Sequence, residues 1–285
     1  MSSAPPVSSR ALEPRAEFSY NETVANDNDS DTAGGKRPPE GMAGLAKGLA
    51  IIEAFTAERT QLTVTDAARA TGITPAAARR CLLTLRELGY LQHEGGYFRP
   101  TPRMMRLGAA YLEAAGLPAL AQPFVLAARD ELAESVSVAV YEAGSALIVA
   151  RAEVQRIVNT GVRMGAQLPA YASASGRVLL AGLGEAELTA YLDSCEPVRT
   201  TSNTLMTIPE IRSRVELARA EGVAFTNEEL ELGVRSMAVP VADSAGRVRA
   251  AMTASTFTAR ASIEEMRVKF LPVLREQAAG LGRIL

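Results

Sequence analysis

The chain has 285 residues, 47% of them hydrophobic, and a formal net charge of −2, so it is long enough for two folded domains and a tail. No apolar run approaches the 18 residues of a membrane-spanning helix, and the N-terminus lacks the pattern of a signal peptide. The two cysteines, Cys81 and Cys195, are too few for a disulfide framework, and we expect a cytoplasmic protein without membrane contact.

Residues 1–41 form the first segment and are rich in Pro, Ser, Asp, Asn and Gly. They carry four basic and seven acidic residues, which gives them a net charge of −3. Their few apolar residues recur at no regular period, and such a composition does not bury a core. We therefore predict a disordered tail and assign it no role.

Two helical patterns follow the tail. Apolar residues at helical spacing predict a first amphipathic helix with the stripe Leu45, Leu49, Ile52 and Phe55. A second helix begins at Thr63 or Thr65, either of which can cap it, and runs to Ala70. Gly72 then supplies a turn, because glycine adopts a left-handed backbone without strain.

A third helix and a hairpin complete a winged helix-turn-helix domain over residues 42–100. The helix has Thr74 as its cap and Pro75 in its first turn, and it ends at Gly89. Its predicted inward residues are Ala78, Leu82, Leu85 and Leu88. Behind it, Gly95-Gly96 predicts a tight turn between two short strands.

This third helix is the candidate DNA-reading element. Between residues 69 and 106 there are seven arginines and two glutamates, a local excess that the net charge hides. A helix in the major groove needs small residues at its leading end and donors behind them. The predicted DNA-binding residues are Thr74, Ala76, Ala77, Arg79, Arg80 and Thr84, with Arg99 and Arg103 as phosphate contacts in or after the wing. The alternative is a solvated face of a helical hairpin.

The rest of the chain reads as a linker and an α+β domain. Residues 101–116 predict a linker helix, which contains the only covalent path between the domains and whose apolar stripe can pack on a partner chain. Residues 117–285 mix predicted helices with predicted strands. The helices are 124–133, 175–181, 185–193, 209–221 and 262–281, and the strands are 136–140, 146–152, 157–162, 223–226, 234–241 and 248–256.

Catalytic chemistry is scarce in this sequence. His93 is the only histidine, and no nucleophile elbow, dinucleotide fingerprint, P-loop or zinc-ligand spacing is present. We predict no catalytic residue, no metal and no cofactor. His93 is either a polar surface residue or a phosphate contact, and the neighbours Glu228 and Glu229 are either solvated carboxylates or an acid–base pair.

Three separated motifs resemble the IclR family of bacterial transcriptional regulators. The first combines Gly44–Ile52, Thr74–Arg80 and Leu88–Leu91, the second is Leu168–Ala181, and the third is Asn227–Pro240. The resemblance runs from Gly44 to the C-terminus. It implies an N-terminal winged helix, a C-terminal effector-binding domain of GAF-like α/β topology, and homodimers or tetramers that bind promoter DNA. RNA polymerase is a further partner to consider.

The resemblance also implies an effector site and a ligand class. The motif wording is most similar to the regulators of protocatechuate and 4-hydroxybenzoate breakdown, the β-ketoadipate group. The implied effector-binding residues are Met164, Gly165, Ala166, Thr226, Val234, Ser236, Thr253 and Ser255. Small-acid sensors of the family tend to have aspartate at position 226 and cysteine at position 236, so a glyoxylate-like ligand is disfavoured here. The alternative for Thr253 and Ser255 is that they are ordinary residues of a strand without a role in binding.

An anionic effector needs a donor, and hydroxyl groups or a guanidinium can supply it. Arg163, Arg177 and Arg235 are the candidate partners, with structural salt bridges as the alternative for Arg177 and Arg235. We therefore expect a regulator of an aromatic-acid catabolic operon, controlled by a small aromatic or dicarboxylic acid. The alternatives are an enzyme that acts on a small organic acid and a regulator that senses a non-aromatic acid.

Overall fold

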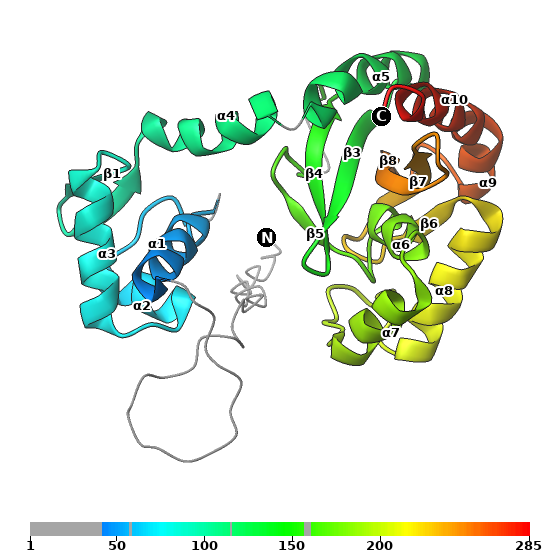
Figure 1. The fold of residues 1–285 in the computed structure, drawn as a ribbon. Helices are drawn as coiled ribbons and strands as arrows, with labels where there is room; N and C mark the ends of the chain where they lie inside the picture. The colour runs from blue at the N-terminus through cyan, green and yellow to red at the C-terminus, as the bar shows by residue number, and fades with distance from the viewer. Residues whose placement is uncertain (1–41, 57–58, 115, 157–160) are drawn as a thin grey trace, which may run out of the picture. The chain divides into compact units, whose positions relative to one another are not determined.

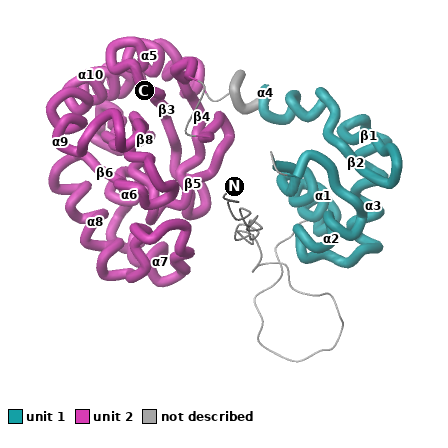
Figure 2. The backbone as a smooth tube through the Cα atoms, turned by 180° about the vertical axis from the view of Figure 1, so that it is seen from behind, with its two compact units in different colours: residues 1–111 teal, residues 112–285 magenta. Residues whose placement is uncertain are grey.

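The computed structural model describes residues 42–56, 59–114, 116–156 and 161–285, and the chain divides into two compact units between Tyr111 and Leu112 (Figure 2). The predicted tail lies outside the described residues. The boundary falls inside helix α4 (Met105–Ala114), which follows a 3-10 turn at Pro102–Met104. The linker predicted over residues 101–116 is thus one helix for most of its length, and each unit is described below by itself.

The first unit is a three-helix domain with a two-stranded wing, as its sequence predicts (Figure 1). Its elements are α1 (Ala43–Glu53), α2 (Val64–Thr71), α3 (Pro75–Glu87), β1 (Leu91–Glu94) and β2 (Tyr97–Pro100). Gly72 has a φ of 66° between α2 and α3, and Gly95 and Gly96 have φ of 59° and 83° in the wing turn. These left-handed positions fix where the two helices and the two strands meet.

Reciprocal capping fixes where the helices of the turn begin. The Thr63 hydroxyl accepts the Asp66 N–H at 3.1 Å, and the Asp66 carboxylate accepts the Thr63 N–H at 3.1 Å. Hydrogen bonds from the Thr63 hydroxyl and then from its backbone hold the pKa of Asp66 below its usual value. The Thr74 hydroxyl caps α3 by accepting the Ala77 N–H at 3.3 Å. Of the two predicted caps for α2, Thr63 is therefore the one used.

Two predictions about the apolar faces of this unit are wrong. In α1, Ile51 is the fully buried residue, whereas Leu45 and Leu49 are 62% and 46% exposed. Leu88, expected to face inward, is 51% exposed because α3 ends at Glu87 and Leu88 already lies in the cap. At the centre of α1, the buried side therefore includes Ile51, one residue before the predicted Ile52.

The second unit is built on a six-stranded antiparallel sheet of order β5-β4-β3-β8-β7-β6 (Figure 1). Its strands are β3 (Ser135–Glu142), β4 (Ser145–Ala152), β5 (Gln167–Pro169), β6 (Ala224–Asn227), β7 (Val234–Ala242) and β8 (Val248–Phe257). Val136, Val138, Met237 and Met252 belong to the core that packs under helices α5 (Leu117–Leu132) and α10 (Leu271–Gly282). The opposite face carries α6 (Ala174–Ala181), and beyond it lie α7 (Glu185–Ser194) and α8 (Ile208–Glu221).

This α+β architecture with helices on both faces of the sheet confirms the predicted fold class, and three local predictions need correction. Helix α5 begins at Leu117, earlier than predicted, with Pro118 in its first turn. A strand was predicted at 157–162, but residues 161–162 are not in a strand and residues 157–160 lie outside the described residues. The short strand β5 was not predicted. The last predicted helix is broken into α9 (Ile263–Glu265), a π-helix (Met266–Phe270) and α10, whose second residue, Pro272, cannot donate a backbone hydrogen bond.

Helix α6 approaches the segment before it so closely that only glycine fits at one position. A Cβ atom on Gly176 would lie 2.3 Å from the Cα and 2.4 Å from the carbonyl oxygen of Ala170. Both are backbone atoms of a buried residue, so no side-chain rotation can relieve the contact. The close approach sets the position of α6 on the sheet.

We predict that Gly176→Ala lowers the free energy of unfolding of the second unit by at least about 1–3 kcal/mol, because added volume has nowhere to go. Gly184→Ser is the matched control, since Gly184 is exposed and serine is a favourable N-cap; its effect should stay within about 0.5 kcal/mol. Urea unfolding followed by circular dichroism measures both variants. Equal stability of Gly176→Ala and the wild type would contradict the close approach.

Candidate functional site

Helix α3 exposes most of the residues predicted to read DNA. Thr74, Ala76, Arg79, Arg80 and Thr84 are all exposed along one side of the helix and at its N-terminus. Ala77 is only 6% exposed, so the outward position expected for it is wrong. It lies beside Ala78 on the side of the helix that packs into the domain. The small residues available for close approach are therefore Thr74 and Ala76.

The exposed side of α3 keeps its positive charge. Within the described residues, no acidic side chain pairs with Arg79 or Arg80, whereas three acidic groups of the same unit have partners elsewhere. The carboxylate of Asp66 belongs to the capping box, that of Glu87 lies 3.9 Å from Arg86, and that of Glu94 lies 3.7 Å from Arg99. The leading half of α3 is thus an uncompensated cationic surface.

Two arginines of the wing region are held in fixed positions. Arg99 donates from Nε and Nη2 to the Gln61 side-chain oxygen at 2.9 and 2.7 Å. The Arg103 guanidinium lies over the Tyr90 ring, 5.3 Å from its centroid, and the His93 ring stacks on Phe98 at 4.2 Å. These contacts neither support nor contradict phosphate binding by Arg99 and Arg103, which stays a prediction.

The second unit gathers hydroxyl groups into a row across its sheet. Strand register places Thr226 opposite Ser236, Ser236 opposite Ser255, and Ser255 opposite Ser135. Directly paired residues of antiparallel strands point to the same face, and the Ser236 and Ser255 hydroxyls are 2.9 Å apart. This polar row lies on the α6 face, since the apolar residues two positions along, such as Ala238, pack against α6.

A second row runs beside the first and contains a buried arginine. Arg151 pairs with Ser137, which pairs with Thr253. Arg151 Nη1 donates to the Ser137 hydroxyl at 2.7 Å and Nε donates to a Glu153 carboxylate oxygen at 2.8 Å, while its side chain is 5% exposed. The Thr253 hydroxyl is buried and has no hydrogen-bond partner among the described residues.

These two polar rows form the candidate effector site. Of the residues predicted from the family resemblance, Thr226, Val234, Ser236, Thr253 and Ser255 all lie on this one face by register. Met164, Gly165 and Ala166 lie on the loop that bonds to β4, where Gly165 N–H donates to the Ile148 carbonyl at 2.8 Å. Met164 is 58% exposed, and Ala166 packs against the α6-face core. The structure thus places the loop at the margin of the site, near strand β4.

Arg151 is the residue of this site that we did not anticipate. Its sequence signal is a charged residue in an otherwise apolar strand, Ser145–Ala152, which reads SALIVARA. Strand alternation puts Ala150 and Ala152 on the opposite, α5-facing side, so Arg151 must point toward α6. Thr256, the other buried hydroxyl without a partner among the described residues, lies on the α5 side and is outside the site.

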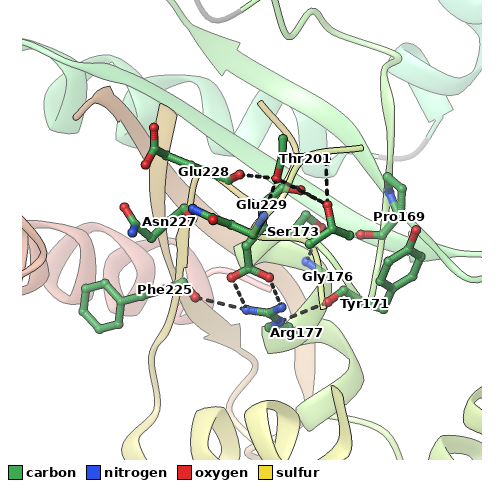
Figure 3. Close-up of polar contacts among 12 residues, drawn as sticks. Pro169, Tyr171, Ser173, Gly176, Arg177, Thr201, Phe225, Asn227, Glu228 and Glu229 are labelled. Carbon is green, nitrogen blue, oxygen red and sulfur yellow. Dashed lines mark hydrogen bonds and ion pairs between the residues drawn. The ribbon is translucent and has the colours of Figure 1, made fainter. Parts of the chain in front are cut away.

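A buried ion pair holds the neighbouring loop in place. Arg177 on α6 donates from both terminal nitrogens to the carboxylate of Glu229, with Nη1 at 2.9 Å from Oε1 (Figure 3). Its remaining donors reach the carbonyls of Tyr171 at 3.0 Å and Phe225 at 3.2 Å. The Arg177 side chain is 1% exposed, and its hydrogen bonds tie α6 to the segment before it and to the loop after β6.

The backbone of the same loop is fastened by threonines. Thr200 and Thr204 hydroxyls donate to the Glu229 carbonyl at 2.9 and 2.7 Å, and the Thr201 hydroxyl donates to the Glu228 carbonyl at 2.6 Å. Glu228 itself has a φ of 59°, and its carboxylate accepts the N–H of Gly233 at 2.7 Å. Both carboxylates therefore have structural partners, which removes Glu228 and Glu229 as an acid–base pair.

The three arginines considered as effector partners have different roles. Arg177 and Arg235 follow the structural alternative: Arg177 pairs with Glu229, and Arg235 donates to Asn227 at 2.6 Å and to the Ala261 carbonyl at 2.9 Å. Arg235 also lies on the opposite face from Ser236. Arg163 is exposed at the loop. The buried guanidinium that faces the polar rows belongs instead to a fourth arginine, Arg151.

Other features of the described residues lie apart from this site. A groove of about 500 Å³ runs between the end of β7 and α10, but none of the polar-row residues lines it, so the site is assigned from its side-chain chemistry. Within the described ranges, no group of three His, Cys, Asp or Glu residues is arranged to hold a metal ion. No described helix is long and apolar enough to cross a membrane.

The two units define a class of protein: a DNA-binding regulator that carries its own ligand-sensing domain. Comparison with protein families identifies the helix-turn-helix domain of IclR over residues 44–95 and the C-terminal domain of the bacterial transcriptional regulator IclR over residues 109–283. The chain belongs to the IclR family of bacterial transcriptional regulators. The family assignment confirms the resemblance found in the sequence, and the members of this family are regulators and not enzymes.

Three individual members of the family show how similar this chain is to regulators with a named role or ligand. The chain is 38% identical over 237 residues to the Pca regulon regulatory protein of Pseudomonas putida, covering 83% of this chain and 81% of that protein. It is 34% identical over 254 residues to the p-hydroxybenzoate hydroxylase transcriptional activator of Acinetobacter baylyi, covering 87% and 94%. An IclR homologue from Microbacterium hydrocarbonoxydans, solved in complex with 4-hydroxybenzoate, is 25% identical with a TM-score of 0.70, covering 84% and 98%.

We predict that Arg177→Met lowers the free energy of unfolding by about 3–5 kcal/mol, because it leaves the Glu229 carboxylate buried without its cation. The double variant Arg177→Met/Glu229→Leu should recover most of that loss, since no unpaired charge remains. Urea unfolding of the three proteins measures the difference. A double variant no more stable than the single one would show that the ion pair is not what fixes the loop.

Proposed function

We propose that this chain is a transcriptional regulator of an aromatic-acid catabolic operon, and that it binds promoter DNA through α3 and the wing. A small aromatic carboxylate bound on the polar rows controls it. The observation that carries the proposal is the buried Arg151 guanidinium on the same face as the hydroxyls of Thr253, Ser236 and Ser255.

The chemistry of the rows fits a hydroxylated carboxylic acid. A guanidinium fork matches a carboxylate, and the attraction strengthens where water is excluded. Arg151 already binds one carboxylate, that of Glu153, whose side chain is 45% exposed and returns to water readily when a ligand replaces it. The Thr253 hydroxyl gains a partner when an acid binds, and the Ser236–Ser255 pair offers both donors and acceptors to a ring hydroxyl.

The relatives support the aromatic class of ligand. Two of them are named for the Pca regulon and for p-hydroxybenzoate hydroxylase, and a solved homologue carries 4-hydroxybenzoate. The rival sensor of a non-aromatic acid stays open to test, because the same guanidinium also binds an aliphatic carboxylate. The enzyme alternative loses its acid–base candidates, since Glu228 and Glu229 have structural partners.

The regulator acts on DNA in the cytoplasm as a homodimer or a pair of dimers. Two copies of α3 then read half-sites whose centres are separated by about one helical turn, roughly 34 Å, or a multiple of it. RNA polymerase is a further partner if bound effector changes transcription without releasing the DNA. Analytical ultracentrifugation with and without operator DNA tests the assembly.

We predict that Arg80→Ala weakens binding to a duplex selected by the wild-type protein from a random pool by about 1–3 kcal/mol, if Arg80 contacts a base. Arg86→Ala is the control on the same helix, because Arg86 is exposed near the helix C-terminus beside Glu87; its effect should stay within about 0.5 kcal/mol. Fluorescence anisotropy titrations measure both. Unchanged binding of Arg80→Ala would remove Arg80 from the DNA-reading set.

We predict that Arg151→Met weakens effector binding about 10- to 100-fold, because a charge-assisted hydrogen bond in a buried site is lost. Arg163→Met should change the affinity less than about twofold, since Arg163 is exposed. Calorimetry with 4-hydroxybenzoate, protocatechuate and adipate measures both variants and the wild type. Full affinity in a folded Arg151→Met protein would contradict the site, and tighter binding of adipate than of either aromatic acid would favour the rival sensor.

A further inference from the structure

The cationic side of α3 has a partner of opposite charge in its own chain. Residues 16–35 contain five acidic residues and no basic one: Glu17, Glu22, Asp27, Asp29 and Asp31. These residues lie outside the described part of the chain, and their sequence alone enters here. On the described side, Arg79 and Arg80 are exposed and have no acidic partner among the described residues of the domain.

The first described helix packs against the helix that carries this surface. Gly44, in the first turn of α1, lies against α3, where its carbonyl oxygen is 3.9 Å from the sulfur of Cys81. Cys81 directly follows Arg79 and Arg80 on the helix. The described chain therefore begins next to α3, although consecutive positions of a helix are about 100° apart and the side that carries Cys81 is not the one that Arg79 presents.

The acidic segment is within reach of the whole helix. Asp31 is eleven residues before Met42, and a chain of that length spans at most about 36–40 Å. Helix α3 has 13 residues and is therefore about 20 Å long. A segment tethered this closely has an effective concentration in the millimolar range at the helix, so even a weak electrostatic contact is populated.

We propose that the acidic segment Glu17–Asp31 docks on the exposed side of α3 around Arg79 and Arg80 and competes there with DNA phosphates. The inference rests on the proposed DNA binding by α3. A competitor in cis lowers the affinity for every DNA sequence by the same factor, because docked protein binds none of them. Salt weakens the docking, so this factor falls as ionic strength rises.

The first experiment compares the full chain with a protein lacking residues 1–41 on a non-specific duplex. At about 50 mM salt we expect the truncated protein to bind about 2- to 10-fold more tightly than the full chain. The ratio of the two affinities should approach one at about 0.5 M salt. Neutralising the five acidic residues to Gln or Asn should reproduce the truncation, whereas shuffling the order of residues 16–35 should not. Equal affinities would overturn the inference, and failure of every protein to bind any duplex would overturn the proposed DNA binding instead.

A second measurement separates docking from long-range repulsion between the tail and DNA. Ser30→Cys and Thr84→Cys, made together with Cys81→Ala and Cys195→Ser, place one thiol in the acidic segment and one exposed thiol on α3, a single helical turn from Arg80. Without DNA, mild oxidation should join the two within one chain, and neutralising the acidic residues or adding about 0.5 M salt should slow this reaction severalfold. A rate of disulfide formation that neither change alters would show that the segment does not dock on α3.

Discussion

The buried pair between Arg177 and Glu229 is the interaction on which the sensing unit depends. Taking two charges out of water costs several kcal/mol, and the cost is recovered only when geometry and hydrogen bonding are nearly complete. Here the guanidinium has the carboxylate on one side and two carbonyls on the other, and three threonines hold the loop that carries Glu229. The pair works together with Gly176, whose missing side chain lets α6 approach close to Ala170.

Fixing α6 in this way determines what the sheet can bind. The helix covers the small apolar residues of the central strands, such as Ala238 and Ala251, and the hydroxyl rows begin two residues further along the same strands. The transition from Ala to Ser and Thr along each strand marks where the core ends and the polar site starts. Thr226 is a residue of the candidate site and lies three residues before Glu229, so a ligand that contacted Thr226 would act on a segment anchored by the ion pair.

The features that the sequence predicted are those with local causes. Thr74-Pro75 at a helix start, the positive φ of Gly72, and Gly95-Gly96 in a hairpin depend on neighbouring residues, and each is found where expected. The features that were missed depend on residues distant in the chain. Arg151 reaches the candidate site only because β4 pairs with β3, and the burial of Ala77, beside the core residue Ala78, depends on contacts from outside α3. Family resemblance placed Thr226, Val234, Ser236, Thr253 and Ser255 together, which periodicity alone could not do.

An effector changes DNA affinity only by binding two states of the protein unequally. The covalent connection between the units runs through α4, so in the proposed homodimer the ligand must bias a state that α4 or a contact between protomers transmits. The positive charge on α3 affects the same equilibrium between DNA-free and DNA-bound protein. Because the exposed arginines of α3 have no acidic partner among the described residues, an anion held near them in the DNA-free state would shift the balance away from DNA. In the proposed regulator, ligand binding in the second unit and the charge of the first unit therefore act on one quantity, the fraction of molecules whose α3 is available to DNA.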